Sequence, residues 1–153
     1  MQAPTTTLGP LALRRVYAAP PERVWRAWID ADALRIWFGQ EGASGWNADW
    51  RVHAGGRYRL EMQDSEGRAW LACGAYREVV PNRRLVLTWS WRPADREATP
   101  GDTEAVITME LSAVDGGTAL DFRLDPMTDP RERDAWRADF KRLGMLLQTE
   151  RPN

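Results

Sequence analysis

The sequence predicts one α+β domain, in which a curved antiparallel sheet of seven strands wraps around a long C-terminal helix and two short helices lie near the N-terminus. Three observations predict it. Apolar residues recur at helical spacing only over 22–38 and 130–148, and alternation with a period of two fills most of 46–124. The turns between the alternating runs are too short for the crossovers that parallel strands need.

The first elements are a strand and a short helix. Residues 11–17 suit a strand, and Pro20 and Pro21 then fix an extended approach and begin a helix. Over 22–29, apolar side chains return at helical spacing, which indicates a helix with one buried face.

A second short helix is expected directly afterwards. Asp30 and Asp32 offer carboxylates that can cap its first turn, and Gly39 is suited to end it. Three apolar residues share one face of this helix: Leu34, Trp37 and Phe38. We expect Phe38, like Trp28 of the preceding helix, to be a core residue, and Trp37 to lie nearer an opening.

The middle of the chain alternates apolar and polar residues, which is typical of half-buried strands. Glycine, proline, asparagine and aspartate fill the short turns between the runs. Connections this short produce an antiparallel meander. The six strands predicted here cover about 46–52, 57–62, 69–79, 84–91, 104–113 and 118–124.

The last helix has the clearest signals. Asp129 can cap it, Pro130 suits its first position, and Glu132 follows the cap by three residues. Its apolar stripe faces the sheet, and Gly144 allows close approach to the sheet or a bend. The stripe consists of Trp136, Phe140, Leu143 and Leu147.

Composition excludes several classes of protein. The net charge of −1 offers no field for nucleic acid or an anionic membrane. Cys73 is the only cysteine, so the chain cannot form an internal disulfide or a cysteine-based zinc site. No run approaches the ~20 apolar residues of a membrane span, and we expect a cytoplasmic protein without metal or cofactor. Residues 1–9 are predicted to be a disordered tail, and 10–149 the domain.

A strongly twisted sheet curls into a half-barrel, and one helix cannot always fill it. Such spaces hold small apolar ligands, although the same rings can also pack into a solid core. Nine tryptophans favour an aromatic interior. We predict polar contacts from His53 and Tyr76. The predicted lining is Trp37, Tyr58, Leu60, Met62, Trp89, Met109, Trp136, Phe140, Leu143 and Leu147.

Other candidate sites have structural explanations. Gly55 and Gly56 precede a strand, whereas phosphate loops lead into helices, so a turn is expected. Cys73 alternates with apolar neighbours and is expected to be a small buried residue. An ion pair between Asp49 and Arg51 is more readily structural than catalytic. Four acids of the strands are expected to face outward: Glu61, Glu78, Glu110 and Asp121.

Several segments together resemble the homologues of the activator of Hsp90 ATPase, a branch of the START/Bet v 1-like (SRPBCC) superfamily. The resemblance covers about 11–148. Family members usually have proline where His53 or Ala54 stands, and also where Gln40 stands. The segments that carry the resemblance are 15–28, 30–39, 49–62, 74–89, 115–118 and 136–147.

The resemblance implies a helix-grip fold with a hydrophobic tunnel under the C-terminal helix. The leading hypothesis is therefore a non-catalytic binder of a small hydrophobic molecule such as a lipid, isoprenoid or polyketide-like compound. A co-chaperone or stress-response module with a protein partner is the second hypothesis. The third is an enzyme of the cyclase or hydratase kind, for which His53, Asp49 and Tyr76 are the candidates. Monomer and homodimer both remain open.

Overall fold

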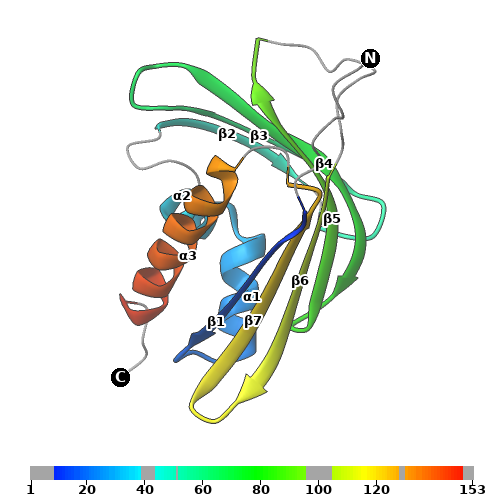
Figure 1. Cartoon of the computed structure of the whole chain (residues 1–153), viewed down its shortest axis with the longest axis vertical. Coiled ribbons are helices and arrows are strands. Elements are labelled where there is room, and N and C mark those ends of the chain that lie inside the picture. Colours follow the sequence, from blue (N-terminus) through cyan, green and yellow to red (C-terminus); the bar gives the residue numbers. More distant parts are fainter. Residues whose placement is uncertain (1–8, 39–43, 51, 96–104, 128–129, 150–153) are drawn as a thin grey trace.

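An antiparallel sheet curves around three helices in the computed structural model, which describes residues 9–38, 44–50, 52–95, 105–127 and 130–149 (Figure 1). Over these residues the strands are hydrogen-bonded in the order β1-β7-β6-β5-β4-β3-β2. The strands are β1 (Leu11–Tyr17), β2 (Ser44–Trp50), β3 (Arg57–Gln63), β4 (Ala69–Val80), β5 (Arg84–Pro93), β6 (Ala105–Val114) and β7 (Gly117–Asp125).

The helices are α1 (Pro21–Ile29), α2 (Ala31–Trp37) and α3 (Arg131–Thr149). All three lie on the same side of the sheet (Figure 1). The predicted α+β class, antiparallel sheet, two short helices and long C-terminal helix are confirmed. The expected tail over 1–9 lies outside the described residues, apart from Gly9, and so does the expected cap Asp129.

The first and last strands in chain order pair with each other in the sheet. β1 pairs with β7, the last strand, so that Leu11 lies opposite Leu124 and Tyr17 opposite Thr118. The Thr118 hydroxyl donates a 2.6 Å hydrogen bond to the Ala19 carbonyl where the chain leaves β1 for α1. This contact fixes the start of α1 against the sheet.

A bend in β4 directs residues toward the helices. The register of β4 on β5 shifts between Tyr76 and Glu78, which marks a β-bulge. Just before it, Gly74 lies so close to β5 that a Cβ on it would come within 2.1 Å of the Thr88 carbonyl oxygen. The Tyr58 hydroxyl, from the paired position on β3, donates a 2.6 Å hydrogen bond to this same oxygen.

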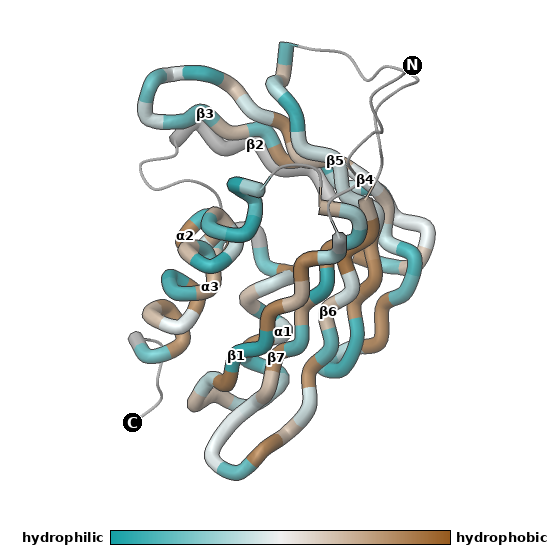
Figure 2. Tube along the Cα trace, viewed as in Figure 1, coloured by the Kyte–Doolittle hydropathy of each residue, from teal (hydrophilic) through white to brown (hydrophobic). Residues whose placement is uncertain are grey.

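The two faces of the sheet differ in character. Hydrophobic and hydrophilic residues alternate along the strands (Figure 2), and the buried apolar residues of strands and helices form one core cluster. The outer face carries ion pairs, among them Arg84 with Glu78 and Glu110 at 3.1 and 3.0 Å, and Arg14 with Asp121 at 2.8 Å. The prediction that these acids face outward is confirmed. Among the described helices, none has the length and apolar character that crossing a membrane requires.

Candidate functional site

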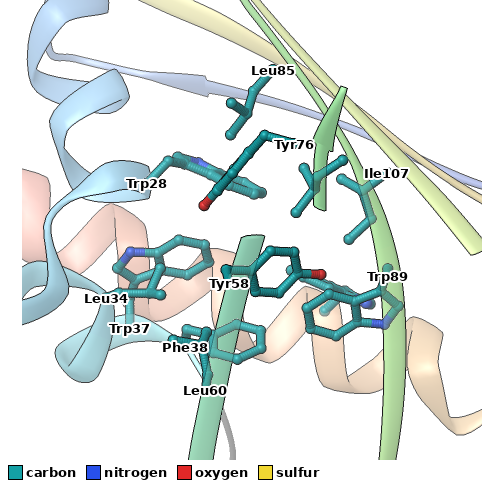
Figure 3. Close-up of a pocket in the computed structure, with 12 residues that line it drawn as sticks. Trp28, Leu34, Trp37, Phe38, Tyr58, Leu60, Tyr76, Leu85, Trp89 and Ile107 are labelled. Carbon is teal, nitrogen blue, oxygen red and sulfur yellow. The ribbon is translucent and has the colours of Figure 1, made fainter. Parts of the chain in front are cut away.

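A small pocket lies between the inner face of the sheet and the helices (Figure 3). Its cavity measures about 40 Å³. Every helix and four strands contribute to its walls. The lining residues are Trp28 of α1; Leu34 and Trp37 of α2 and the following Phe38; Tyr58 and Leu60 of β3; Tyr76 of β4; Leu85, Leu87 and Trp89 of β5; Ile107 of β6; and Trp136 of α3.

Trp136 is the centre of the aromatic packing around this pocket. Its ring is nearly parallel to that of Trp28, with centroids 6.5 Å apart, and lies 4.6 Å from Phe122. Three more rings pack against it from α3, β5 and the end of α2, and they bury it almost completely. These are Phe140 at 5.8 Å, Trp89 at 5.4 Å and Phe38 at 5.6 Å.

Hydrogen bonds hold the α2 wall in place. The Trp37 indole N–H donates to the Ala27 carbonyl at 2.8 Å, which ties α2 to α1. The Trp37 carbonyl accepts from Nε of Arg142 at 3.2 Å, and Arg142 pairs with the buried carboxylate of Asp139. The Trp37 side chain is 0% exposed, so the expectation that it lies nearer an opening is wrong. The acceptor of its N–H lies on α1. The periodicity of α2 alone does not reveal this contact.

The polar atoms of the lining are few and uncharged. The Tyr58 hydroxyl is engaged with the Thr88 carbonyl, as described above. Burial raises the pKa of Tyr76 above its ordinary value, so this phenol stays protonated. The Trp28 indole nitrogen is buried and has no hydrogen-bond partner among the described residues. None of the lining residues carries a charge.

A row of indoles continues the pocket wall along β5 and β4. Trp91 is nearly parallel to Trp89, with centroids 6.2 Å apart, and also to Trp70, 5.6 Å away. The half-exposed Trp70 ends the row: Arg68 lies 4.9 Å above its ring, and its N–H donates to Asp64 at 3.0 Å. Hydrogen bonding, first from the Trp70 indole, lowers the pKa of Asp64.

The structure gathers part of the predicted lining around the cavity. Trp37, Tyr58, Leu60, Trp89 and Trp136 line it, together with Tyr76, the predicted polar contact. The remaining predicted lining residues are buried in the surrounding core and do not border the cavity. These are Met62, Met109, Phe140, Leu143 and Leu147.

Sequence reasoning missed half of the lining. Leu85 and Leu87 share the inner face of β5 with Trp89, so the period of two in this strand could have identified them. Trp28 and Phe38 were expected in the core and are indeed buried, but nothing in the local pattern indicates that they border a cavity. The other residues missed are Leu34 and Ile107.

Of the acid–base candidates, Tyr76 lines this pocket and His53 does not. His53 is exposed in the turn before β3, where its Nδ1 lies 3.1 Å from the Ala54 carbonyl oxygen. The side chain of Asp49 and the whole of Arg51 lie outside what the structure describes, and so does their expected ion pair. Among the described residues, no three histidine, cysteine, aspartate or glutamate side chains gather as a metal site would require.

Comparison with known proteins gives a consistent result. The family model described as "Activator of Hsp90 ATPase homolog 1-like protein" matches residues 18–147. No curated protein matches the chain. Among solved structures, a protein of Chromobacterium violaceum is 28% identical with a TM-score of 0.80, and the match covers 95% of this chain and 99% of that one.

Two further structures agree with this match. A protein of Rhodobacter sphaeroides is 27% identical with a TM-score of 0.73, over 94% of this chain and 95% of that one. The AHSA1 protein of Silicibacter pomeroyi is 23% identical with a TM-score of 0.77, over 93% and 99%, and this likeness is one of fold alone.

Proposed function

Because the chain belongs to the family of activator of Hsp90 ATPase homolog 1-like proteins, whose fold commonly serves to bind hydrophobic ligands, we propose that it binds a small, uncharged, apolar molecule in the pocket under α3. One observation carries the proposal: seven of the twelve lining residues are aromatic, the other five are aliphatic, and none is charged. Burial of the ligand supplies the affinity, at roughly 25 cal/mol per Å² of apolar area before the costs of association.

The size of the cavity limits the class of ligand. At about 40 Å³ it is far below the roughly 300–1,000 Å³ of pockets that hold drug-sized ligands. Any ligand larger than a few water molecules must therefore displace side chains as it enters. Displacing many packed rings is costly, because each aromatic pair contributes about 0.5–1.5 kcal/mol beyond its buried area. The geometry therefore favours a compact, flat molecule over a long lipid chain.

Native mass spectrometry of gently purified protein tests the proposal first. We expect a co-purifying apolar species of low mass, released on denaturation. A parallel titration with toluene, followed by NMR of the indole N–H signals, is expected to shift the signals of Trp28 and Trp136. A bare mass together with unmoved indole signals would overturn the proposal.

Two variants locate the binding site. Leu87→Ala enlarges the pocket, whereas Leu124→Ala removes the same atoms from a buried position on β7 outside the lining. Both lower stability, by about 2–5 kcal/mol for such substitutions in a core. Only Leu87→Ala is expected to change toluene affinity. Equal effects of the two variants would place binding elsewhere.

A second candidate function is a protein-interaction module, a co-chaperone related to the activators of Hsp90 ATPase. Two observations favour it: the interior is nearly filled, and the helices expose large apolar side chains, with Ile36 of α2 at 58% and Met145 of α3 at 59%. Its test is the ATPase rate of an Hsp90-type chaperone, measured with the wild-type protein and with Ile36→Ser and Met145→Ser. A rate unaffected by the wild-type protein rules this candidate out.

A further inference from the structure

We infer that the indole N–H of Trp28 and the hydroxyl of Tyr76 together recognise one neutral acceptor oxygen of the ligand, so that the ligand is an uncharged carbonyl compound. The inference rests on the proposed function and adds the chemistry of the bound molecule. Trp28 belongs to α1 and Tyr76 to β4, and both border the cavity.

Trp28 has an unused donor. Its side chain is 7% exposed, and its indole nitrogen is buried without a partner among the described residues. A buried donor left unsatisfied costs about 1–3 kcal/mol, and native proteins keep few of them. Trp37, a neighbour in the lining, instead donates its indole N–H to the Ala27 carbonyl. Among the described residues, the Trp28 indole nitrogen is the one fully buried side-chain nitrogen or oxygen without a hydrogen-bond partner, and Trp28 borders the cavity.

Tyr76 supplies a second donor. The side chain is 6% exposed and borders the cavity. The hydroxyls of Tyr58 and Tyr17 already donate to the carbonyls of Thr88 and Phe140. In Figure 3 the Tyr76 side chain extends toward the part of the pocket where the Trp28 ring lies. Two residues that carry neutral donors therefore border the same small space.

The absence of charged residues from the lining indicates which acceptor group of a ligand fits. Burial holds Tyr76 in its protonated form, so it donates and does not act as an anion. No cationic side chain borders the cavity to compensate a carboxylate or phosphate. An uncompensated anion in such surroundings would be strongly disfavoured. The oxygen that fits two neutral donors is the carbonyl of a ketone, aldehyde, ester or amide.

Two probes of nearly equal shape test this inference. Acetophenone carries a carbonyl oxygen, and α-methylstyrene replaces it with a methylene group. The dissociation constants of both probes are measured by NMR for the wild-type protein and for Tyr76→Phe. The ratio of the two constants is then compared between the two proteins, because the difference in hydrophobicity between the probes affects both ratios equally. Tyr17→Phe is the control, because it removes a buried hydroxyl outside the pocket.

We expect Tyr76→Phe to reduce the preference for acetophenone by about 2- to 12-fold, the range for one net hydrogen bond, and Tyr17→Phe to leave it unchanged. In the wild-type protein, acetophenone but not α-methylstyrene is expected to move the Trp28 N–H proton signal downfield. If both probes bind but the preference is the same in Tyr76→Phe and the Trp28 signal responds equally to both, the carbonyl inference fails and the proposed function stands. If neither probe binds, both fail.

Discussion

The ring of Tyr17 on β1 lies against Gly144 of α3, where a Cβ on the glycine would come within 3.3 Å of the ring. One turn earlier in the helix, the Phe140 carbonyl accepts a 3.1 Å hydrogen bond from the Tyr17 hydroxyl. A glycine inside a helix costs about 1 kcal/mol relative to alanine. Here it allows α3 to approach the sheet edge closely.

Gly144→Leu is expected to lower the free energy of unfolding by about 1–3 kcal/mol, because the added side chain must displace the Tyr17 ring or lift the helix. Urea denaturation measures the effect. The neighbouring Met145→Ala, at an exposed position of the same helix, is the control and should stay within about 0.5 kcal/mol. Stabilisation by Gly144→Leu, as helix propensity alone predicts, would contradict the packing described here.

Gly74→Ala tests the close approach of β4 and β5. Its Cβ would lie 2.1 Å from the Thr88 carbonyl oxygen, a backbone atom that cannot rotate away. We expect the substitution to lower the free energy of unfolding by at least about 2 kcal/mol, because the two strands must move apart to accommodate the methyl group. Gly9→Ala, where a Cβ meets nothing within 4 Å, provides the matched control. Thermal melting that shows equal effects of the two changes would refute the constraint.

Asp139→Ala and Asp121→Ala compare a buried ion pair with an exposed one. Asp139 is buried beside Arg142, whose guanidinium also holds the Trp37 carbonyl. Asp139→Ala removes the carboxylate that faces a partly buried guanidinium, and we expect destabilisation of about 3 kcal/mol. Asp121 pairs with Arg14 on the exposed outer face, so Asp121→Ala should lower the free energy of unfolding by less than about 1 kcal/mol. Similar losses in chemical denaturation would show that the Asp139 pair does not stabilise the α2 wall.

Stability should decline in alkali because of two tyrosines. Burial raises the pKa of Tyr17 and Tyr76 above the ordinary value of 10.0, so above pH 10 the unfolded chain releases these protons while the folded protein keeps them. The free energy of unfolding then falls with rising pH, by up to about 1.4 kcal/mol per pH unit for each phenol. Denaturation at pH 9–11 measures this slope.

The double variant Tyr17→Phe with Tyr76→Phe removes the two phenols and is expected to flatten the slope. An unchanged slope would mean that other groups control the alkaline transition. Absorbance near 295 nm, which reports phenolate directly, identifies when each phenol ionises.

Local periodicity predicted the buried face of the principal elements. Trp136, Phe140 and Leu143 recur at helical spacing and are all buried on α3, and Tyr58 and Leu60 alternate along β3 and are buried as well. Such patterns succeed because each residue's orientation follows from the repeat of its own helix or strand. The outward direction of the charged positions follows from the same repeat.

The prediction was wrong where the contacts are not local. Cys73 was expected to be buried by alternation, yet it is half-exposed on β4, while its neighbour Ala72 is fully buried. Both Leu71 and Ala72 are buried, so this strand has no simple alternation before its bulge. A bulge depends on the partner strand, and the sequence of one strand does not show it.

The sequence by itself determined the α+β class, the long helix against the sheet and the aromatic filling, because these follow from hydrophobic period and turn chemistry. Only the tertiary structure decided the volume of the cavity, the unpartnered indole N–H of Trp28 and the place of Tyr76 in the same lining. These residues lie 48 positions apart in the chain. Their meeting depends on how α1 and β4 are placed around the pocket, and the free volume is the small remainder left when large rings from distant segments meet.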